Sequence, residues 1–108
     1  MNITQIDSQT KRNKKYRKVV YTDSQMQLVI MCVPASKSIP YEVHKHTTQF
    51  TKIVEGRCSV TMDGGKGKRY VKAGASIIIP NGTRHLITNT SKTKPLKLYS
   101  VYARPESV

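Results

Sequence analysis

Short runs of alternating apolar and polar residues fill most of this chain, and turn residues separate them at regular spacing. A period of two places successive side chains on opposite faces of a strand. We therefore predict about nine or ten short strands and an all-β sandwich or jelly roll. No segment has a helical period of useful length. The strands are expected at residues 19–21, 25–33, 44–46, 50–54, 58–62, 66–72, 76–79, 83–88 and 96–103.

Residues 25–33 are apolar at both even and odd positions. A strand that is apolar on both faces is covered twice. We therefore expect this strand at the centre of a sandwich or at an interface between subunits. Leu28 and Ile30 are the candidate contact residues for such an interface.

A predicted hairpin spans residues 74–89. Its first strand is the β-branched run Ser76–Ile79, and a turn follows at residues 80–82, because Pro80 fixes φ and Gly82 tolerates positive φ. In the returning strand, His85 and Ile87 share one face. The hairpin therefore gives His85 a defined direction, with a hydrogen-bonded histidine of purely structural role as the alternative.

A second polar cluster precedes the hairpin. His44 and His46 lie two positions apart, which in a strand places both imidazoles on one face, roughly 6–7 Å apart. Gln49 follows with a side-chain carbonyl that can coordinate a metal. The chain has three histidines, His44, His46 and His85. Converging imidazoles suit a divalent transition metal, so we predict a metal site, with a metal-free polar barrel mouth as the alternative.

The two clusters resemble the paired motifs of the cupin superfamily. The motif Gly-x5-Pro-x-Gly-x2-His-x3-Asn is met by Gly74, Pro80, Gly82, His85 and Asn89. The other motif is met by His44, His46 and Gly56, with Gln49 at its carboxylate position. From Arg17 to Pro105 the chain is similar to small single-domain cupins, which implies a cupin jelly-roll barrel, or double-stranded β-helix.

The chain departs from the cupin pattern at three points. Ser38 stands near the position of an expected glycine. The gap between His46 and Gln49 is one residue short, so we expect a bulge or a tighter turn to aim Gln49 at the histidines. A neutral glutamine also replaces the acidic ligand, which leaves more positive charge on the metal.

The resemblance implies a fold more than a reaction. Some relatives are labelled only by analogy with mannose-6-phosphate isomerase. The imidazoles predict one divalent ion (Zn, Fe, Mn or Ni), and the basic body of the protein suits a small, anionic, sugar-like ligand at the barrel mouth. An iron-dependent dioxygenase is the alternative. For isomerase chemistry, Glu42 is the best candidate base because it shares a strand face with His44, and Tyr41 offers a hydroxyl. A salt bridge from Glu42 to Lys45 or Lys97 is its alternative role.

The chain is strongly basic, with a formal charge of +13 over 108 residues. Residues 1–18 carry +5 and residues 19–108 carry +8. We divide the chain into a basic, flexible N-terminal arm, residues 1–18, and a cupin barrel domain, residues 19–108. A basic surface attracts phosphorylated ligands and polyanions. A third hypothesis is therefore a non-catalytic protein whose Lys11–Lys18 segment binds nucleic acid or an acidic partner, the alternative being a solvated surface.

The remaining features concern compartment and assembly. There is no apolar signal segment and no transmembrane run, so we expect a cytoplasmic protein without a membrane partner. Cys32 and Cys58 are expected to be reduced and buried. We expect the C-terminal extension of similar cupins to be missing or cut short after residues 105–108, which would leave a sheet edge open, and we therefore expect a homodimer.

Overall fold

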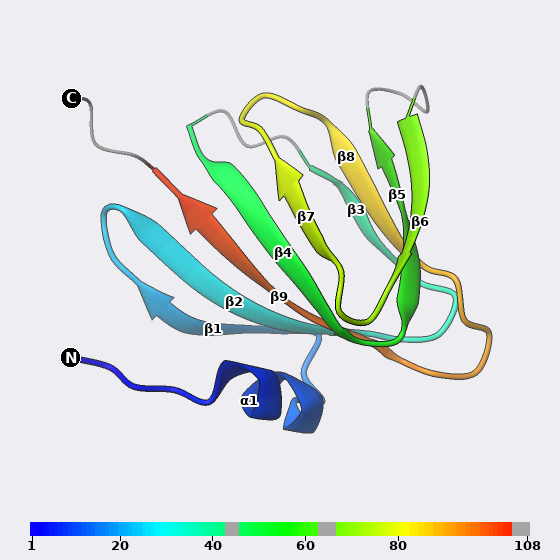
Figure 1. Ribbon diagram of the computed structural model, residues 1–108, viewed down its shortest axis with the longest axis horizontal. Coiled ribbons are helices and arrows are strands. Elements are labelled where there is room, and N and C mark those ends of the chain that lie inside the picture. Colours follow the sequence, from blue (N-terminus) through cyan, green and yellow to red (C-terminus); the bar gives the residue numbers. More distant parts are fainter. Residues whose placement is uncertain (43–45, 63–66, 105–108) are drawn as a thin grey trace.

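The computed structural model describes residues 1–42, 46–62 and 67–104, except for the side chains of Tyr41 and Glu42. The described chain has one helix followed by nine strands, drawn in Figure 1. Their bounds are α1 (Ile6–Arg12), β1 (Arg17–Thr22), β2 (Met26–Val33), β3 (Ser38–Glu42), β4 (Thr48–Glu55), β5 (Arg57–Met62), β6 (Gly67–Lys72), β7 (Ser76–Ile79), β8 (His85–Asn89) and β9 (Leu96–Ala103).

The strands form two antiparallel sheets. One has the order β1-β2-β9-β4-β7 and the other has the order β3-β8-β5-β6. From β2 to β9 the chain passes repeatedly between the sheets, as in a jelly roll. The sheets face each other and diverge toward one end, which we call the wide end (Figure 1). The wide end carries the β1–β2 turn, the β7–β8 connection at residues 80–84 and the start of β4 (Figure 1). The predicted all-β jelly roll is confirmed, although the described strands do not join into one closed barrel.

The core lies between the two sheets. In each strand that borders it, alternate side chains point inward, and a cluster of buried aliphatic side chains and Cys58 forms its apolar part. Burial of this apolar surface supplies most of the favourable free energy of folding. The buried cluster consists of Val29, Met31, Val33, Ile39, Ile53, Cys58, Val60, Ile77, Ile79, Ile87, Leu96 and Leu98.

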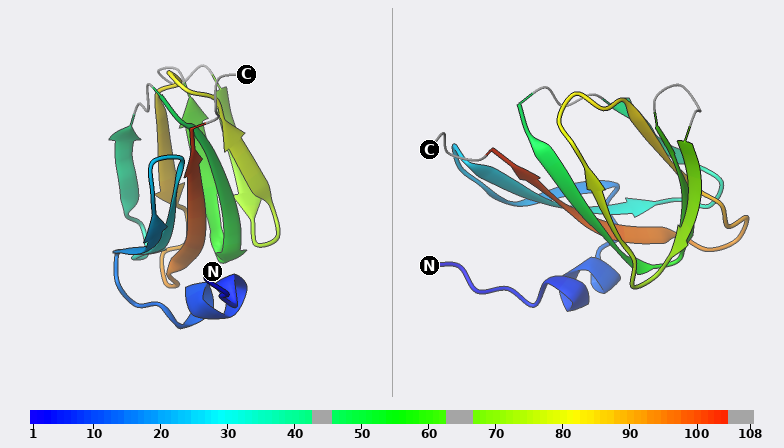
Figure 2. Two further views of the ribbon diagram at one scale, coloured as in Figure 1. Left: turned by 90° about the vertical axis from the view of Figure 1, so that its left-hand side faces the viewer. Right: turned by 45° about the horizontal axis from the view of Figure 1, so that its top comes forward.

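Helix α1 covers the outer face of the five-stranded sheet, as both views in Figure 2 show. Ile30 points to this outer face, between the inward-facing neighbours Val29 and Met31, and it is fully buried. The prediction that β2 is covered on both faces is therefore confirmed. The second cover is a helix of the same chain, so the homodimer stays a prediction.

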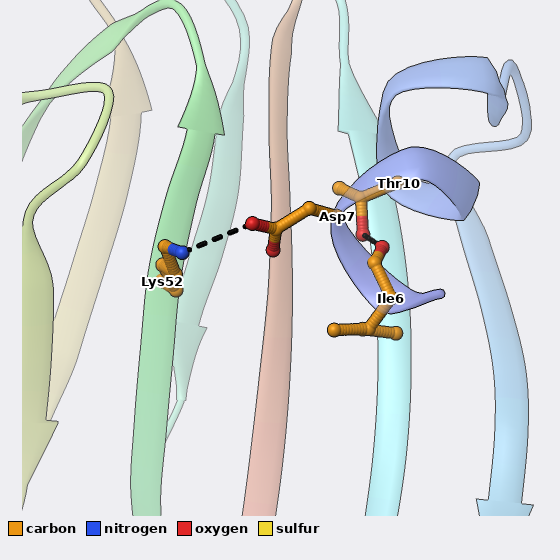
Figure 3. Close-up of polar contacts among 4 residues, drawn as sticks. All are labelled: Ile6, Asp7, Thr10 and Lys52. Carbon is orange, nitrogen blue, oxygen red and sulfur yellow. Dashed lines mark hydrogen bonds and ion pairs between the residues drawn. The ribbon is translucent and has the colours of Figure 1, made fainter. Parts of the chain in front are cut away.

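Figure 3 shows one hydrogen bond within α1 and one ion pair between α1 and β4. Thr10 is fully buried, and its Oγ1 donates a hydrogen bond to the carbonyl oxygen of Ile6 at 2.7 Å. Nζ of Lys52 on β4 lies 3.1 Å from Oδ2 of Asp7. The segment expected as a basic, flexible arm therefore contains the helix α1, and β1 begins at Arg17. The division into an arm, residues 1–18, and a barrel domain, residues 19–108, stays a prediction. The outer face of the sheet stabilises a helix too short to form alone.

Strands β7 and β9 span the residues predicted for them, 76–79 and 96–103. The segment 34–40, expected as a loop, instead enters β3 at Ser38. Pairing with β8 overrides the local turn composition there, and Oγ of Ser38 lies 2.7 Å from Oγ1 of Thr88. Ser38 therefore needs no glycine, and the positive φ of this region, 64°, falls on Ser36.

Two glycines that the sequence assigned to turns do adopt positive φ. Gly82 has a φ of 77° in the β7–β8 connection, and Gly56 has a φ of 96° between β4 and β5. A Cβ at Gly56 would lie 2.8 Å from the carbonyl oxygen of Pro95, so any side chain there would clash with backbone.

In the described part of the chain, no helix is both long and apolar enough to span a bilayer.

Candidate metal centre

His85 is the first residue of β8 and points into the space between the sheets. It pairs with Met62 of β5 and Glu42 of β3, and its side chain is 2% exposed. Nδ1 lies 3.1 Å from the carbonyl oxygen of Thr83. Because a carbonyl oxygen only accepts, Nδ1 must carry the proton, so the neutral ring has its lone pair on the buried Nε2. Metal binding through Nε2 requires this tautomer.

Gln49 is the second residue of β4 and lies on the inner face of the other sheet. Its side chain is 3% exposed, and Nε2 donates a hydrogen bond to Oγ1 of Thr51 at 2.9 Å. Oγ1 of Thr51 is in turn 2.7 Å from Oγ of Ser100 on β9. These contacts hold the amide group of Gln49 in place on the inner face of β4. Oε1 is left buried, with no hydrogen-bond partner among the described residues.

The fold places Gln49 and His85 at the same end of the two sheets. Gln49 pairs with Ile79, the last residue of β7, and His85 opens β8 after the β7–β8 connection. Both residues are buried on inner faces, one in each sheet. The fold therefore brings Gln49 and His85, which were predicted as metal ligands from separate motifs, to the wide end.

His46 differs from its prediction. It lies in a bend and is exposed, and β4 begins only at Thr48. The expectation that His46 belongs to a strand is therefore wrong, since β4 pairs with β9 only from Thr48 onward. His44 lies outside the described residues. Within the described ranges no group of three or more His, Cys, Asp or Glu side chains gathers, so the three-histidine centre stays a prediction.

The two residues proposed for acid–base chemistry are at the end of β3. Glu42 is the register partner of His85, which places its backbone beside the candidate centre. The side chains of Tyr41 and Glu42 lie outside the described part, so their catalytic roles stay predictions. Lys97, one alternative partner for Glu42, extends toward α1, where its Nζ donates to the carbonyl oxygen of Lys11.

Asn89, the last residue of the second motif, has a structural role. It is 1% exposed, and its Nδ2 lies within hydrogen-bond distance of the carbonyl oxygens of Val33, Pro34 and Lys94, at 3.0, 3.2 and 2.9 Å. Its Oδ1 accepts from the backbone N–H of Ser91 at 2.9 Å. Asn89 therefore joins β2 to the β8–β9 connection, far along the strand from His85.

Sequence reasoning did not single out Thr51 or Ser100. Thr51 sits two positions after Gln49, and this spacing in a strand was the available signal that the two side chains share a face. Ser100 could not be found this way, because its contact with Thr51 depends on the pairing of β4 with β9.

The sequence of this chain also matches a known protein family. Residues 29–102 match the sequence profile of the Cupin domain, which is more than half of the chain. The chain belongs to the cupin family. The resemblance predicted from the two motifs is confirmed. In this cupin the motif residues His85 and Asn89 are both buried, as described above.

Two curated relatives are uncharacterized proteins. YrkC of Bacillus subtilis is 36% identical over 107 residues, which cover 95% of this cupin and 57% of YrkC. L612 of Acanthamoeba polyphaga mimivirus is 33% identical over 102 residues, which cover 94% of this cupin and 64% of L612. The chain thus spans less than two thirds of either relative. The crystal structure of BH2720 from Bacillus halodurans matches with a TM-score of 0.91 and 34% identity, covering 99% of this cupin and 83% of that chain.

Proposed function

We propose that this cupin binds one divalent transition metal at the wide end and uses the site for a small anionic ligand. Oε1 of Gln49 carries the proposal, because it is buried and has no hydrogen-bond partner among the described residues. Such a buried acceptor costs about 1–3 kcal/mol when nothing binds it. A bound cation would remove this cost.

The donor types fit a transition metal. Nε2 of His85 and Oε1 of Gln49 would hold it from the two inner faces, and His44 and His46 would supply further imidazoles from the segment between β3 and β4. Imidazole nitrogen suits Zn, Fe and Ni better than Mg or Ca, and Mn accepts a mixed oxygen and nitrogen set. The set is neutral throughout, so the full charge of the ion is available to attract an anion.

The protein's own residues orient this site and would handle protons. The carbonyl of Thr83 holds the ring of His85, and Thr51 holds the amide of Gln49. When bound, the metal would polarise a carbonyl or phosphoryl oxygen of the ligand. Glu42, opposite His85 in the sheet, is our candidate for moving a proton on the ligand, with the hydroxyl of Tyr41 as its partner. This arrangement favours isomerase-type chemistry on a sugar-like compound.

Metal analysis of protein purified without a histidine tag tests the proposal. The protein is stripped, reconstituted separately with Zn, Mn, Fe or Ni, desalted and measured by plasma mass spectrometry. We expect about one ion per chain, and a metal affinity at least about tenfold lower in His85→Ala and Gln49→Leu. Asn81→Ala, in the exposed β7–β8 connection, is the control and should keep the metal.

The Gln49→Glu variant distinguishes the loss of a metal ligand from the loss of the folded structure. A carboxylate at this position should raise metal affinity above that of the wild type, since the negative charge pairs with the cation. Circular dichroism checks the fold of every variant. Failure of both the wild type and Gln49→Glu to retain any of the four metals would overturn the proposal. Oxygen consumption by the iron-loaded protein would replace the isomerase assignment with a dioxygenase.

A further inference from the structure

A cavity of about 290 Å³ lies at the wide end, beside the candidate metal centre. The β1–β2 turn, residues 23–25, and Met26 at the start of β2 form one side of it. The rest of its lining comes from Arg17, Gln27, Thr47, Tyr102 and Arg104. Its volume is close to the lower limit of pockets that bind small molecules.

Strand pairing relates the cavity to Gln49 across the five-stranded sheet. Gln27 of β2 pairs with Tyr102 of β9, and Tyr102 pairs with Gln49 of β4. Paired residues point to the same face of an antiparallel sheet, so these three form one row on the inner face. Thr47 lines the same cavity and directly follows His46 in the chain. A ligand of a few ångströms in length would reach from the cavity toward Gln49.

Two arginines line this cavity, Arg17 from β1 and Arg104 directly after the end of β9. Nη2 of Arg17 donates to Oε1 of Gln27 at 3.3 Å. The backbone N–H of Arg104 donates to the carbonyl oxygen of Gln25 at 2.7 Å, which fixes the residue after β9 against the β1–β2 turn. Guanidinium groups present planar donors that match carboxylate and phosphate oxygens.

The carboxylate of Asp23 also borders the cavity, but its oxygens are engaged within the turn. Oδ1 accepts from the backbone N–H groups of Gln25 and Met26 at 2.8 and 2.9 Å, and Oδ2 accepts from the hydroxyl of Tyr21 at 2.7 Å. These hydrogen bonds, that from Gln25 first, hold the pKa of Asp23 below its usual value. The carboxylate therefore fastens the turn, and the two arginines leave the lining with a net positive charge.

We propose that this cavity binds the oxyanion group, phosphate or carboxylate, of the small-molecule ligand, with Arg17 and Arg104 as its binding residues. Gln27 and Thr47 supply further polar groups along the path toward the metal centre. The inference rests on the proposed function in one respect, namely that the bound anion and the metal belong to the same ligand site. Anion binding by the two arginines itself needs no metal.

Isothermal titration of metal-stripped protein at constant ionic strength tests the proposal. The probes are inorganic phosphate, glucose 6-phosphate and succinate, with glucose as the uncharged control. We expect at least one anion to bind and glucose not to bind. Arg17→Gln and Arg104→Gln should each raise the dissociation constant about tenfold or more. Arg17→Lys should recover part of the loss, because it keeps the charge without the planar fork.

Arg69→Gln is the matched control, since it removes the same charge from an exposed position on β6 in the other sheet. It should bind as the wild type does, and thermal unfolding verifies the fold of each variant. Phosphate binding alone assigns a phosphorylated ligand, and succinate binding alone assigns a carboxylic acid; either supports the proposal. Equal loss in Arg69→Gln, or no anion binding at about 10 mM, roughly tenfold above the weak end of typical KM values, overturns it. Anion binding without any metal retention would overturn the proposed function alone.

Discussion

Nε2 of Gln49 donates a hydrogen bond of 2.9 Å to Oγ1 of Thr51, two residues along the inner face of β4. The contact is buried, and Thr51 also meets Ser100 of β9 at 2.7 Å. It holds the Nε2 end of the amide against the protein, and Oε1 has no hydrogen-bond partner among the described residues. Thr51 is therefore a positioning residue for the candidate centre rather than a ligand.

Thr51→Val should lower metal affinity about tenfold while leaving the ligand atoms in place. Valine has the shape of threonine but cannot accept the hydrogen bond, so the amide of Gln49 loses its orientation and its Nε2 becomes unsatisfied. Stability should fall by about 1–3 kcal/mol. Metal titration and denaturant unfolding measure the two effects. Thr51→Ser keeps the hydroxyl and should keep most of the affinity; an equal loss in both variants would contradict the positioning role.

Asn89→Ala should destabilise the protein by at least about 2 kcal/mol. The substitution removes a buried side chain and its polar contacts to the backbone of Val33, Pro34, Lys94 and Ser91, of which those to Val33 and Ser91 are buried. Urea unfolding measures the change. Asn81→Ala, at an exposed position in the β7–β8 connection, should change stability by less than about 0.5 kcal/mol. Comparable losses in the two variants would show that the buried contacts of Asn89 do not stabilise the fold.

Deletion of residues 1–12 should lower the free energy of unfolding by about 1–3 kcal/mol, because it exposes the outer face around Ile30 while leaving β1 complete. The ion pair between Asp7 and Lys52 should account for little of this. Both side chains are partly exposed, at 51% and 31% respectively, so Asp7→Asn alone should cost less than about 1 kcal/mol. Thermal unfolding of the two variants measures both effects. A deletion that left stability unchanged would mean that α1 does not dock in solution.

Cys58 should be an unreactive thiol. Burial raises its pKa from a usual 9.0 to about 11, so the thiol stays protonated at neutral pH. In the native protein at pH 8, a thiol-specific reagent should modify the half-buried Cys32 much faster than Cys58. Because the folded protein holds this proton more tightly than the unfolded chain does, the contribution to stability is complete below pH 9 and is lost as pH rises through 11. Cys58→Val should lack this part of the alkaline decline; an identical decline in both proteins would exclude Cys58 as its source.

Much of the fold was predictable because its signals are local. Residues 76–79 and 96–103 alternate in hydrophobicity or are β-branched, and they form β7 and β9 as expected. Gly82 marked a turn and has positive φ. Helix α1 was not predictable, since its seven residues carry no apolar stripe of their own and gain stability from the sheet beneath them. Strand β3 was missed for a related reason, because its pairing partner β8 lies about fifty residues away.

The sequence by itself determined the family, the jelly-roll class and two residues of the candidate centre, His85 and Gln49. These follow from motif spacing and strand periodicity, which depend only on neighbours along the chain. The tertiary structure decided that Gln49 is held by Thr51, that Asn89 serves the scaffold, and that Arg17 and Arg104 share a cavity. Those relationships arise from strand pairing and sheet packing between distant segments, and no local pattern of residues encodes which strands will meet.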